Sequence, residues 1–278
     1  MFVLVRGALP YLPVLLIASV FGFVRASGYY RPVRQEKDEV LKNQILTVLS
    51  HRPSYGYRRI AMELDLGKKQ IQRVMHLYNI HPYKRHGRWR KRRDERRKPV
   101  LFQNHIKGQC PCVPNQTWVS DFTYIPFKKK FIYLATIMDL YTREIVGWHI
   151  SNTHTKLLVM EAFLDALVNQ RMKRPQVIHS DQGSEYASQD YTKLVENFGV
   201  TVSMSTKSSP WENGYQESFF NNFKTDLGLE FDRFSDVGHL AEAIHHTIHD
   251  YNYHRIHTTQ KMTPYQFRLQ YETHKQVV

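Results

Sequence analysis

The sequence predicts an α/β protein in which a mixed β-sheet core follows a small all-α domain. Residues 35–80 place apolar side chains at helical spacing, whereas residues after 116 alternate strand-like and helical stretches. Charge divides the chain at the same point: residues 1–115 hold 23 Lys and Arg against 7 Asp and Glu, and the remainder holds 16 against 18. A basic part joined to a near-neutral part indicates a polyanion-binding module, with nucleic acid as the leading partner, attached to a domain with another task.

Length and composition exclude several classes of protein. The 278 residues correspond to about two domains. With 42% hydrophobic and 23% charged residues, the chain does not resemble a disordered, collagenous or coiled-coil protein. The two cysteines, Cys110 and Cys112, are too close together to staple a secreted scaffold, so a reducing cytoplasm is the expected location.

Residues 1–34 form a hydrophobic N-terminal segment whose role the sequence leaves open. Its 18 residues from Gly7 to Val24 carry no charge, and a membrane-spanning helix needs about 20. Pro10 and Pro13 would disturb such a helix. We therefore expect a buried helix or a start of translation that has drifted, and membrane insertion or export remains the less favoured alternative.

Residues 35–83 are expected to form a helix-turn-helix domain. Three apolar repeats predict three helices, separated at Ser54–Tyr57 and at Gly67. The basic side chains on the second and third helices are candidate DNA contacts, although any soluble helix has a charged outer face. These candidates are Arg58, Arg59, Lys68, Lys69 and Arg73.

Residues 84–112 are interpreted as a basic linker that follows DNA. Ten of the fifteen residues from 84 to 98 are Lys or Arg, so the segment would repel itself unless a polyanion neutralised it. The residues that we single out are Arg88, Arg90, Lys91, Arg92 and Arg93.

Residues 113–278 are expected to form the core. Strand-like runs at 117–125, 131–138 and 144–150 predict three consecutive antiparallel strands. A helix at 156–170, a strand at 177–179, a helix at 191–198 and a strand at 200–204 follow, with two further helices after them. The order predicts a mixed sheet.

Three acids in this core are candidate catalytic residues. Asp121 interrupts an aromatic and β-branched strand, where a carboxylate is unusual unless a cation or an exposed edge accommodates it. Asp181 follows the fourth strand, where α/β sheets bind ligands, although it could instead cap the turn before Gly183. We choose Glu217 as the third acid because Ser209, Pro210 and Glu212 fit a helix N-terminus with a capping box. At helical spacing, Glu217 is then expected on a polar helix face with Asn213, Asn221 and Lys224. The aromatic side chains of Tyr215, Phe219 and Phe223 are expected on a different face. Gly214, near the polar face, would allow another backbone to approach closely.

Carboxylates on separate elements favour hard divalent cations such as Mg²⁺. Two such ions can activate an attacking oxygen and stabilise the leaving oxygen of a phosphodiester. A zinc site at His105, Cys110 and Cys112 is disfavoured because no second pair of ligands follows. The chain also lacks a Walker loop, a G-x-S-x-G elbow and a dinucleotide fingerprint.

Residues 36–272 resemble the second-frame (OrfB) transposases of bacterial insertion sequences, which have a retroviral-integrase-type core. Between Asp181 and Glu217 stand 35 residues, the D-D-35-E spacing of that superfamily. The motifs that carry the resemblance are, in order, Ser27–Tyr30, Tyr55–Ile60, Asn115–Tyr124, Met138–Trp148, His179–Tyr186, Glu212–Phe220, Tyr251-Asn252-x-x-Arg255-x-His257 and Thr263-Pro264.

The resemblance implies an RNase H-like fold in which Asp121, Asp181 and Glu217 hold two Mg²⁺ ions, with Mn²⁺ as a substitute. It implies that Lys224 contacts phosphate, and that the protein releases a 3′-hydroxyl at the element end and joins it to target DNA. Asp139 is left out of the triad, because a turn-stabilising pairing with Arg143 is the favoured interpretation. A homo-oligomer on DNA, association with the nucleoid and an upstream-frame (OrfA) partner or frameshift fusion are also expected.

Three alternatives remain from the sequence. A non-catalytic transposition regulator, or an incomplete partner of a frameshift fusion, would keep the basic half without metal-dependent chemistry. An RNase H-like nuclease would cleave DNA without joining it. A membrane-anchored protein would follow if residues 7–24 inserted into a bilayer.

Overall fold

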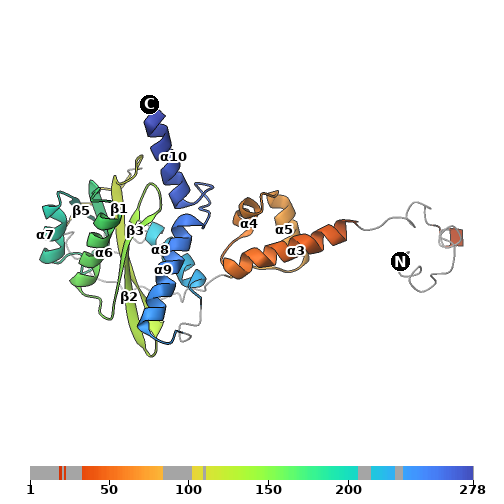
Figure 1. The fold of residues 1–278 in the computed structure, drawn as a ribbon, viewed down its shortest axis with the longest axis horizontal. Coiled ribbons are helices and arrows are strands. Elements are labelled where there is room, and N and C mark those ends of the chain that lie inside the picture. The colour runs from red at the N-terminus through yellow and green to blue at the C-terminus, as the bar shows by residue number, and fades with distance from the viewer. Residues whose placement is uncertain are drawn as a thin grey trace.

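The computed structural model describes residues 33–83, 102–108, 111–205, 214–228 and 234–277, together with Ser19, Val20 and Gly22. A three-helix region lies beside a larger α/β core (Figure 1). Most of the hydrophobic segment 7–24, the basic run 84–98 and the expected helix start at Ser209–Asn213 lie outside the described residues. Within the described part of the chain, none of the helices has the length and hydrophobicity of a membrane span.

The helical region contains α3 (Val33–His51), α4 (Tyr57–Glu63) and α5 (Lys68–Leu77), as the three apolar repeats predict. Side chains three or four positions apart on each helix meet in one hydrophobic cluster. The fully buried members include Ile45, Tyr55, Ile60, Ile71 and Val74. This cluster is separate from those of the core, so the region has its own hydrophobic interior.

The core is built on a five-stranded mixed sheet in the order β3-β2-β1-β4-β5. β1 (Thr117–Phe127), β2 (Lys130–Asp139) and β3 (Ile145–Ser151) are consecutive antiparallel strands, as predicted. β4 (Val177–Ser180) pairs parallel to β1, and β5 (Thr201–Met204) pairs parallel to β4. β1 is therefore the central strand, with the antiparallel β2 on one side and the parallel β4 on the other.

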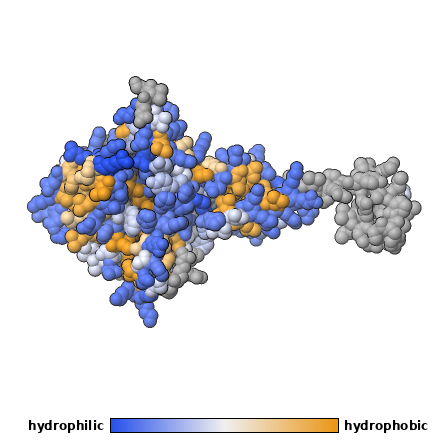
Figure 2. Space-filling model, viewed as in Figure 1, coloured by the Kyte–Doolittle hydropathy of each residue, from blue (hydrophilic) through white to orange (hydrophobic). Residues whose placement is uncertain are grey.

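Helices cover both faces of the sheet (Figure 1). Successive residues of a strand point to opposite faces. Trp118 accordingly packs in the cluster that includes α6 (Lys156–Asn169) and α7 (Gln189–Asn197), and Val119 packs in the cluster that includes α8 (Gly214–Asp226) and α9 (Val237–Tyr253). Hydrophilic side chains cover much of the visible outer surface, with hydrophobic residues between them (Figure 2).

Three helices, not two, follow β5 in the described part of the chain, so the expected number was wrong. The additional helix is α10 (Pro264–Val277). Its start is a capping box, in which Thr263 Oγ1 accepts from the Gln266 backbone N–H at 3.2 Å and Gln266 Oε1 accepts from the Thr263 N–H at 3.1 Å. Thr263-Pro264 therefore has a local structural role as a helix start.

The helical region contacts the core through the loop between α3 and α4. The Tyr55 hydroxyl accepts from the backbone N–H of Ile256 at 2.8 Å, and Arg255 Nη2 donates to Ser54 Oγ at 2.8 Å. Arg59 Nε donates to Thr258 Oγ1 at 3.1 Å. Two motifs about 200 residues apart, Tyr55–Ile60 and the segment around Arg255, thus form one contact.

Candidate active site

The sheet register brings Asp121 and Asp181 to neighbouring positions. β1 and β4 pair in parallel up to Val119 and His179, and each acid stands two residues further along the chain, Asp121 within β1 and Asp181 just after β4. Beyond Ser180, β4 ends while β1 continues to Phe127. Asp121 lies opposite Thr136 of β2, in the central strand, so the alternative of an exposed sheet edge is wrong. The two carboxyls therefore stand where the pairing of β1 with β4 stops, beside the carboxyl end of β4, which is a usual place for ligands in such sheets.

Asp121 is held in an environment that opposes its negative charge. Burial raises the pKa of Asp121 to about 7, and the Asp181 and Glu217 carboxylates contribute to this rise. The backbone N–H of Phe122, which donates to Asp121 Oδ1 at 2.8 Å, and the Lys224 ammonium act in the opposite direction. The charges of the other two candidate acids and of Lys224 therefore all act on Asp121.

Asp181 both caps the turn before Gly183 and stands at the ligand position after the fourth strand, the two interpretations that the sequence left open. Its Oδ1 accepts from the Gly183 backbone N–H at 3.0 Å, which is the turn-capping contact. The residue is nonetheless exposed at the end of β4, and partial burial of its carboxyl together with Glu185 raises its pKa. Capping the turn fixes Asp181 beside Asp121 without removing it from solvent.

The helix α8 brings Glu217 to the site. Glu217 is exposed in the first described turn, and at 100° per residue it shares a side of the helix with Asn221 and Lys224. The helix face that packs on the sheet consists of Gln216, Phe219, Phe220 and Phe223. Tyr215 is 47% exposed, so its expected place in the aromatic face was wrong.

Gln216, which the sequence reasoning missed, is fully buried and joins α8 to two strands. Its Nε2 donates to the Val119 carbonyl at 2.8 Å, and its Oε1 accepts from Thr136 Oγ1 at 3.0 Å. Its position three and four residues before Phe219 and Phe220, on the apolar side of the helix, was the available signal. Among the described residues, the expected close approach at Gly214 does not occur, because none of their atoms lies within 4 Å of a Cβ built there.

Lys224 is 8% exposed, and its ammonium nitrogen lies 4.8 Å from the centre of the Tyr124 ring. Its charge lowers the pKa of Asp121. The side chain thus lies against β1 near the carboxylates rather than in solvent. A lysine held in this way can place a positive charge next to a phosphate bound at the acids.

Asp139 stabilises a turn, but not through the Arg143 side chain, so that expected pairing was wrong. Its carboxylate accepts from the backbone N–H groups of Asn115 at 2.6 Å and Thr142 at 2.7 Å, and from Thr142 Oγ1 at 2.9 Å. Arg143 contributes a backbone N–H to the Asp139 carbonyl, and its guanidinium lies over Tyr215 instead. These contacts leave Asp139 out of the candidate site.

Tyr186 is a second residue that sequence reasoning did not assign. It is fully buried, and its hydroxyl accepts from Ser120 Oγ at 3.1 Å. Burial and the nearby Asp121 charge raise the pKa of this phenol well above its ordinary value. Tyr186 therefore supports the strand next to Asp121 as a neutral group.

The donor set fits hard divalent cations. Carboxylate oxygens are the ligands that Mg²⁺ prefers, and a buried carboxyl whose pKa is raised further by two like charges has negative charge that a cation would relieve. Among the described residues, no three His, Cys, Asp or Glu side chains already stand at ligand spacing. The carboxylates of Asp121, Asp181 and Glu217 therefore lie near one another, but they do not already have the spacing of a complete set of metal ligands.

The candidate DNA contacts differ in how freely they face solvent. Lys68 and Lys69 are exposed on α5, and Arg58 is exposed on α4. Arg73 instead binds Asp38 through two hydrogen bonds of 2.6 and 2.5 Å, which hold α5 against α3. Arg59 is turned toward the core through Thr258. The five basic residues singled out in the linker lie outside the described residues.

Comparison with known proteins decides the family. Two models described as an integrase core domain match residues 113–210 and 198–264. The transposase for insertion sequence element IS904 of Lactococcus lactis is 32% identical over 71% of this chain and 81% of its own length. The chain belongs to the insertion-sequence transposases with an integrase core domain. A 31 kDa protein of insertion element IS600 from Shigella sonnei is also 32% identical, over 92% of this chain and 98% of its own length.

The fold of this transposase-family chain also occurs among solved structures. A chain in the cryo-electron microscopy structure of a simian T-cell lymphotropic virus intasome, in complex with a PP2A regulatory subunit, aligns with a TM-score of 0.51. The alignment covers 81% of this chain and 73% of that chain at 20% sequence identity. Together with the mixed five-stranded sheet, this likeness confirms the RNase H-like fold.

Proposed function

We propose that the chain is a DDE transposase that cleaves the ends of an insertion sequence and joins the freed 3′ ends to target DNA. One observation carries the proposal: Asp121 and Asp181 stand side by side where the pairing of β1 with β4 stops, and Glu217 and Lys224 of α8 act on the Asp121 charge. Family membership supports a role in DNA transposition.

Asp121, Asp181 and Glu217 are the residues that would hold two Mg²⁺ ions, with Mn²⁺ as a substitute. Bound there, the ions would supply charge stabilisation to the attacking and leaving oxygens of a phosphodiester. The protein's own groups hold the site in shape: Gly183 and Phe122 fix two of the carboxylates, and Gln216 fixes the helix that carries the third. Lys224 would neutralise the phosphate that lies against the acids.

The reaction has two stages. In the first, water attacks a phosphodiester at the element end, and the bond to the 3′ oxygen breaks to leave a 3′-hydroxyl. In the second, this hydroxyl attacks a target phosphodiester, and a target 3′ oxygen leaves. Both stages break one P–O bond and form another, so neither needs an external energy source.

DNA would be held mainly outside the catalytic site. We propose that Arg58, Lys68 and Lys69 contact phosphates, because they are exposed basic residues on neighbouring helices. The basic linker would add a salt-sensitive contribution that does not depend on sequence, through Arg88, Arg90, Lys91, Arg92 and Arg93. Arg59 and Arg73 remain candidates, although each already binds a neighbouring side chain. Such a protein would act on the bacterial nucleoid, as a homo-oligomer on DNA.

The test incubates the purified chain with DNA that carries the flanking sequences of its own gene, with Mg²⁺ or Mn²⁺. Wild type is compared with Glu217→Gln, which removes one carboxylate charge and keeps the shape of the side chain. We expect cleaved and joined products from wild type only, with equal DNA binding by both proteins. Equal cleavage by both proteins would contradict the assignment of Glu217.

The products also separate the alternatives. Cleavage without joined products would identify a nuclease, and DNA binding without either product would identify a regulator or an incomplete partner. In the second case, the upstream-frame fusion protein is the one to compare with the chain alone.

A further inference from the structure

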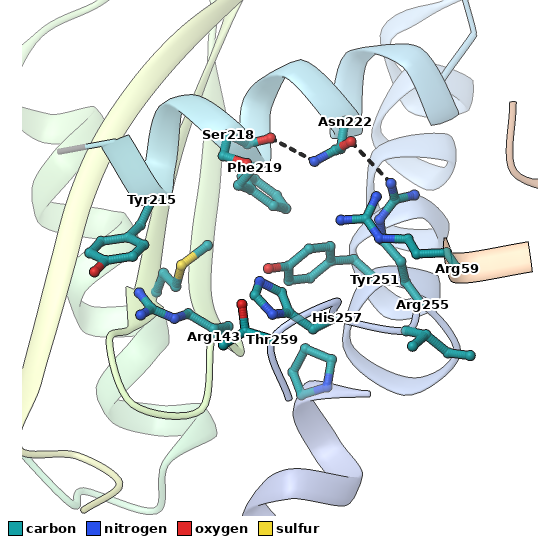
Figure 3. A pocket seen from close by; sticks show the side chains of 13 residues that line it. Arg59, Arg143, Tyr215, Ser218, Phe219, Asn222, Tyr251, Arg255, His257 and Thr259 are labelled. Carbon is teal, nitrogen blue, oxygen red and sulfur yellow. Dashed lines mark hydrogen bonds between the residues drawn. The ribbon is translucent and has the colours of Figure 1, made fainter. Parts of the chain in front are cut away.

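Three arginines from three separate elements surround a pocket of about 230 Å³ next to α8 (Figure 3). Arg59 belongs to α4, Arg143 to the turn between β2 and β3, and Arg255 to the segment after α9. We call this cavity the arginine pocket. No Asp or Glu is among the described residues that line it.

Two of the three guanidinium charges lack a carboxylate partner in the described part of the chain. Arg255 forms an ion pair with Asp226 and also donates to Asn222 Oδ1 at 3.1 Å. Arg59 forms no such ion pair and donates to the neutral hydroxyl of Thr258, although its charge also interacts with the Asp226 carboxylate that Arg255 binds. Arg143 lies with its guanidinium carbon 3.6 Å from the centre of the Tyr215 ring, and no described residue accepts a hydrogen bond from its buried Nη1.

His257 also has a buried nitrogen without a hydrogen-bond partner among the described residues. Its ring points into the pocket between Arg143 and Tyr251 (Figure 3). Its Nδ1 is buried and has no hydrogen-bond partner among the described residues. Buried polar atoms are usually paired, so unpartnered nitrogens beside two guanidinium groups that form no ion pair among the described residues indicate that an acceptor with negative charge is the missing partner.

We propose that the arginine pocket binds a phosphate group. Phosphate offers several acceptor oxygens and a negative charge, and the planar guanidinium matches it with two parallel donors. The cavity is smaller than the roughly 300–1,000 Å³ typical of pockets for drug-sized ligands, so it suits a phosphate group better than a whole nucleotide. The group is either a free phosphate ion or a backbone phosphate of DNA that passes the pocket.

The pocket is distinct from the candidate active site but shares a helix with it. Tyr215, Ser218, Phe219 and Asn222 line it from α8, whereas Glu217 is not among its lining residues and lies on another side of that helix. Arg59 comes from the helical region, so a bound phosphate would join α4, α8 and the segment after α9. Where the phosphate belongs to DNA, the inference rests on the proposed function, whereas binding of free phosphate does not.

The first experiment titrates inorganic phosphate into the full chain by calorimetry, without DNA or divalent metal. Wild type is compared with Arg143→Gln and with Arg171→Gln, which removes the same charge at an exposed position outside the pocket. We expect saturable binding at one site, weakened at least tenfold in Arg143→Gln and unchanged in Arg171→Gln. No saturable binding by wild type, or equal affinity in Arg143→Gln, would overturn the proposal.

Two further variants test whether the effect of Arg143→Gln on phosphate binding is specific to the arginine pocket. Arg59→Gln removes a charge from a different element and should weaken phosphate binding to a similar degree, while circular dichroism checks that each variant is folded. Glu217→Gln should bind phosphate as wild type does. Loss of cleavage and loss of the phosphate site are therefore distinguishable.

A DNA-binding series then identifies the source of the phosphate. If a DNA phosphate occupies the pocket, Arg143→Gln should weaken binding of a short duplex several-fold and reduce the slope of log affinity against log salt by about one. If free phosphate is the ligand, duplex affinity should match that of Arg171→Gln. Both results support the site, provided that the phosphate titration succeeds.

Discussion

The side-chain amide of Gln216 donates to the backbone carbonyl of Val119 at 2.8 Å. Gln216 immediately precedes Glu217 on α8, and Val119 stands two residues before Asp121 on β1. The same side chain accepts from Thr136 Oγ1 on β2. One buried amide thus fixes the helix that carries the third acid against the strand that carries the first.

Replacing Gln216 with Leu should reduce stability. The variant leaves the buried Thr136 hydroxyl without its acceptor and the Val119 carbonyl without this donor, at a cost of about 1–3 kcal/mol in the free energy of unfolding. Urea denaturation measures the effect. Gln189→Leu, at an exposed position that begins α7, is the matched control and should stay near wild type. Equal stability of the two variants would show that the Gln216 contacts contribute nothing net.

Asn252 makes a comparable connection between α9 and β3. Its Oδ1 accepts from the Ile145 N–H, and its Nδ2 donates to the Ile145 carbonyl, both at 2.9 Å. Asn252→Ala leaves two buried backbone groups without these partners and should lower the free energy of unfolding by about 2–4 kcal/mol. The Ile145 amide should also exchange with deuterium faster than in wild type or in Asn197→Ala, a change at an exposed position of α7. Unchanged exchange at Ile145 would contradict this role.

Local patterns predicted most of the elements, because strands and helices of this core have regular apolar periodicity. The strand around Asp121 alternates between two hydrophobic clusters, and the acid was a candidate because it interrupts that apolar run. The relation of Asp121 to Asp181 required only the parallel pairing of two strands. Contacts between distant side chains were not predictable in the same way. Gln216, Asn252 and Tyr186 all stand within the motifs of the sequence, but the sequence does not show which distant groups they bind.

The errors have physical causes of the same kind. We expected Asp139 to pair with Arg143, which lies four residues away in the same turn. The Asp139 carboxylate instead accepts hydrogen bonds from backbone N–H groups, and the Arg143 guanidinium lies over the Tyr215 ring. Gly214 was expected at a close contact because glycine is unfavourable inside a helix. Among the described residues, none comes within 4 Å of a Cβ built at Gly214, so no close contact explains this glycine.

The glycine at a true close contact is Gly147. A Cβ there would lie 2.5 Å from both the backbone nitrogen and the Cβ of Ala166, so α6 would have to move away from β3. We expect Gly147→Ala to lower the free energy of unfolding by about 1–3 kcal/mol or more. Gly214→Ala has open space and should be neutral or slightly stabilising. Thermal unfolding of the two variants distinguishes these outcomes, and a stable Gly147→Ala would mean that the helix and sheet are less tightly packed than the structure shows.

The arginine pocket predicts how stability depends on pH. Burial, and then the charges of Arg143, Arg59 and Arg255, lower the pKa of His257 from 6.5 to about 4. The unfolded chain therefore takes up a proton below about pH 6.5 that the folded chain refuses until about pH 4. Stability attributable to His257 is complete above about pH 6.5 and is lost as the pH falls toward about 4, by on the order of 3 kcal/mol.

Urea denaturation at about pH 7, 5.5 and 4.5 measures this dependence. His257→Gln should flatten the slope across this range, whereas His246→Gln, at an exposed position of α9, should keep the wild-type slope. Because a bound anion would offset the three guanidinium charges, saturating phosphate should shift the His257 transition to higher pH. Equal slopes in His257→Gln and wild type would show that the ring is not held neutral by its surroundings.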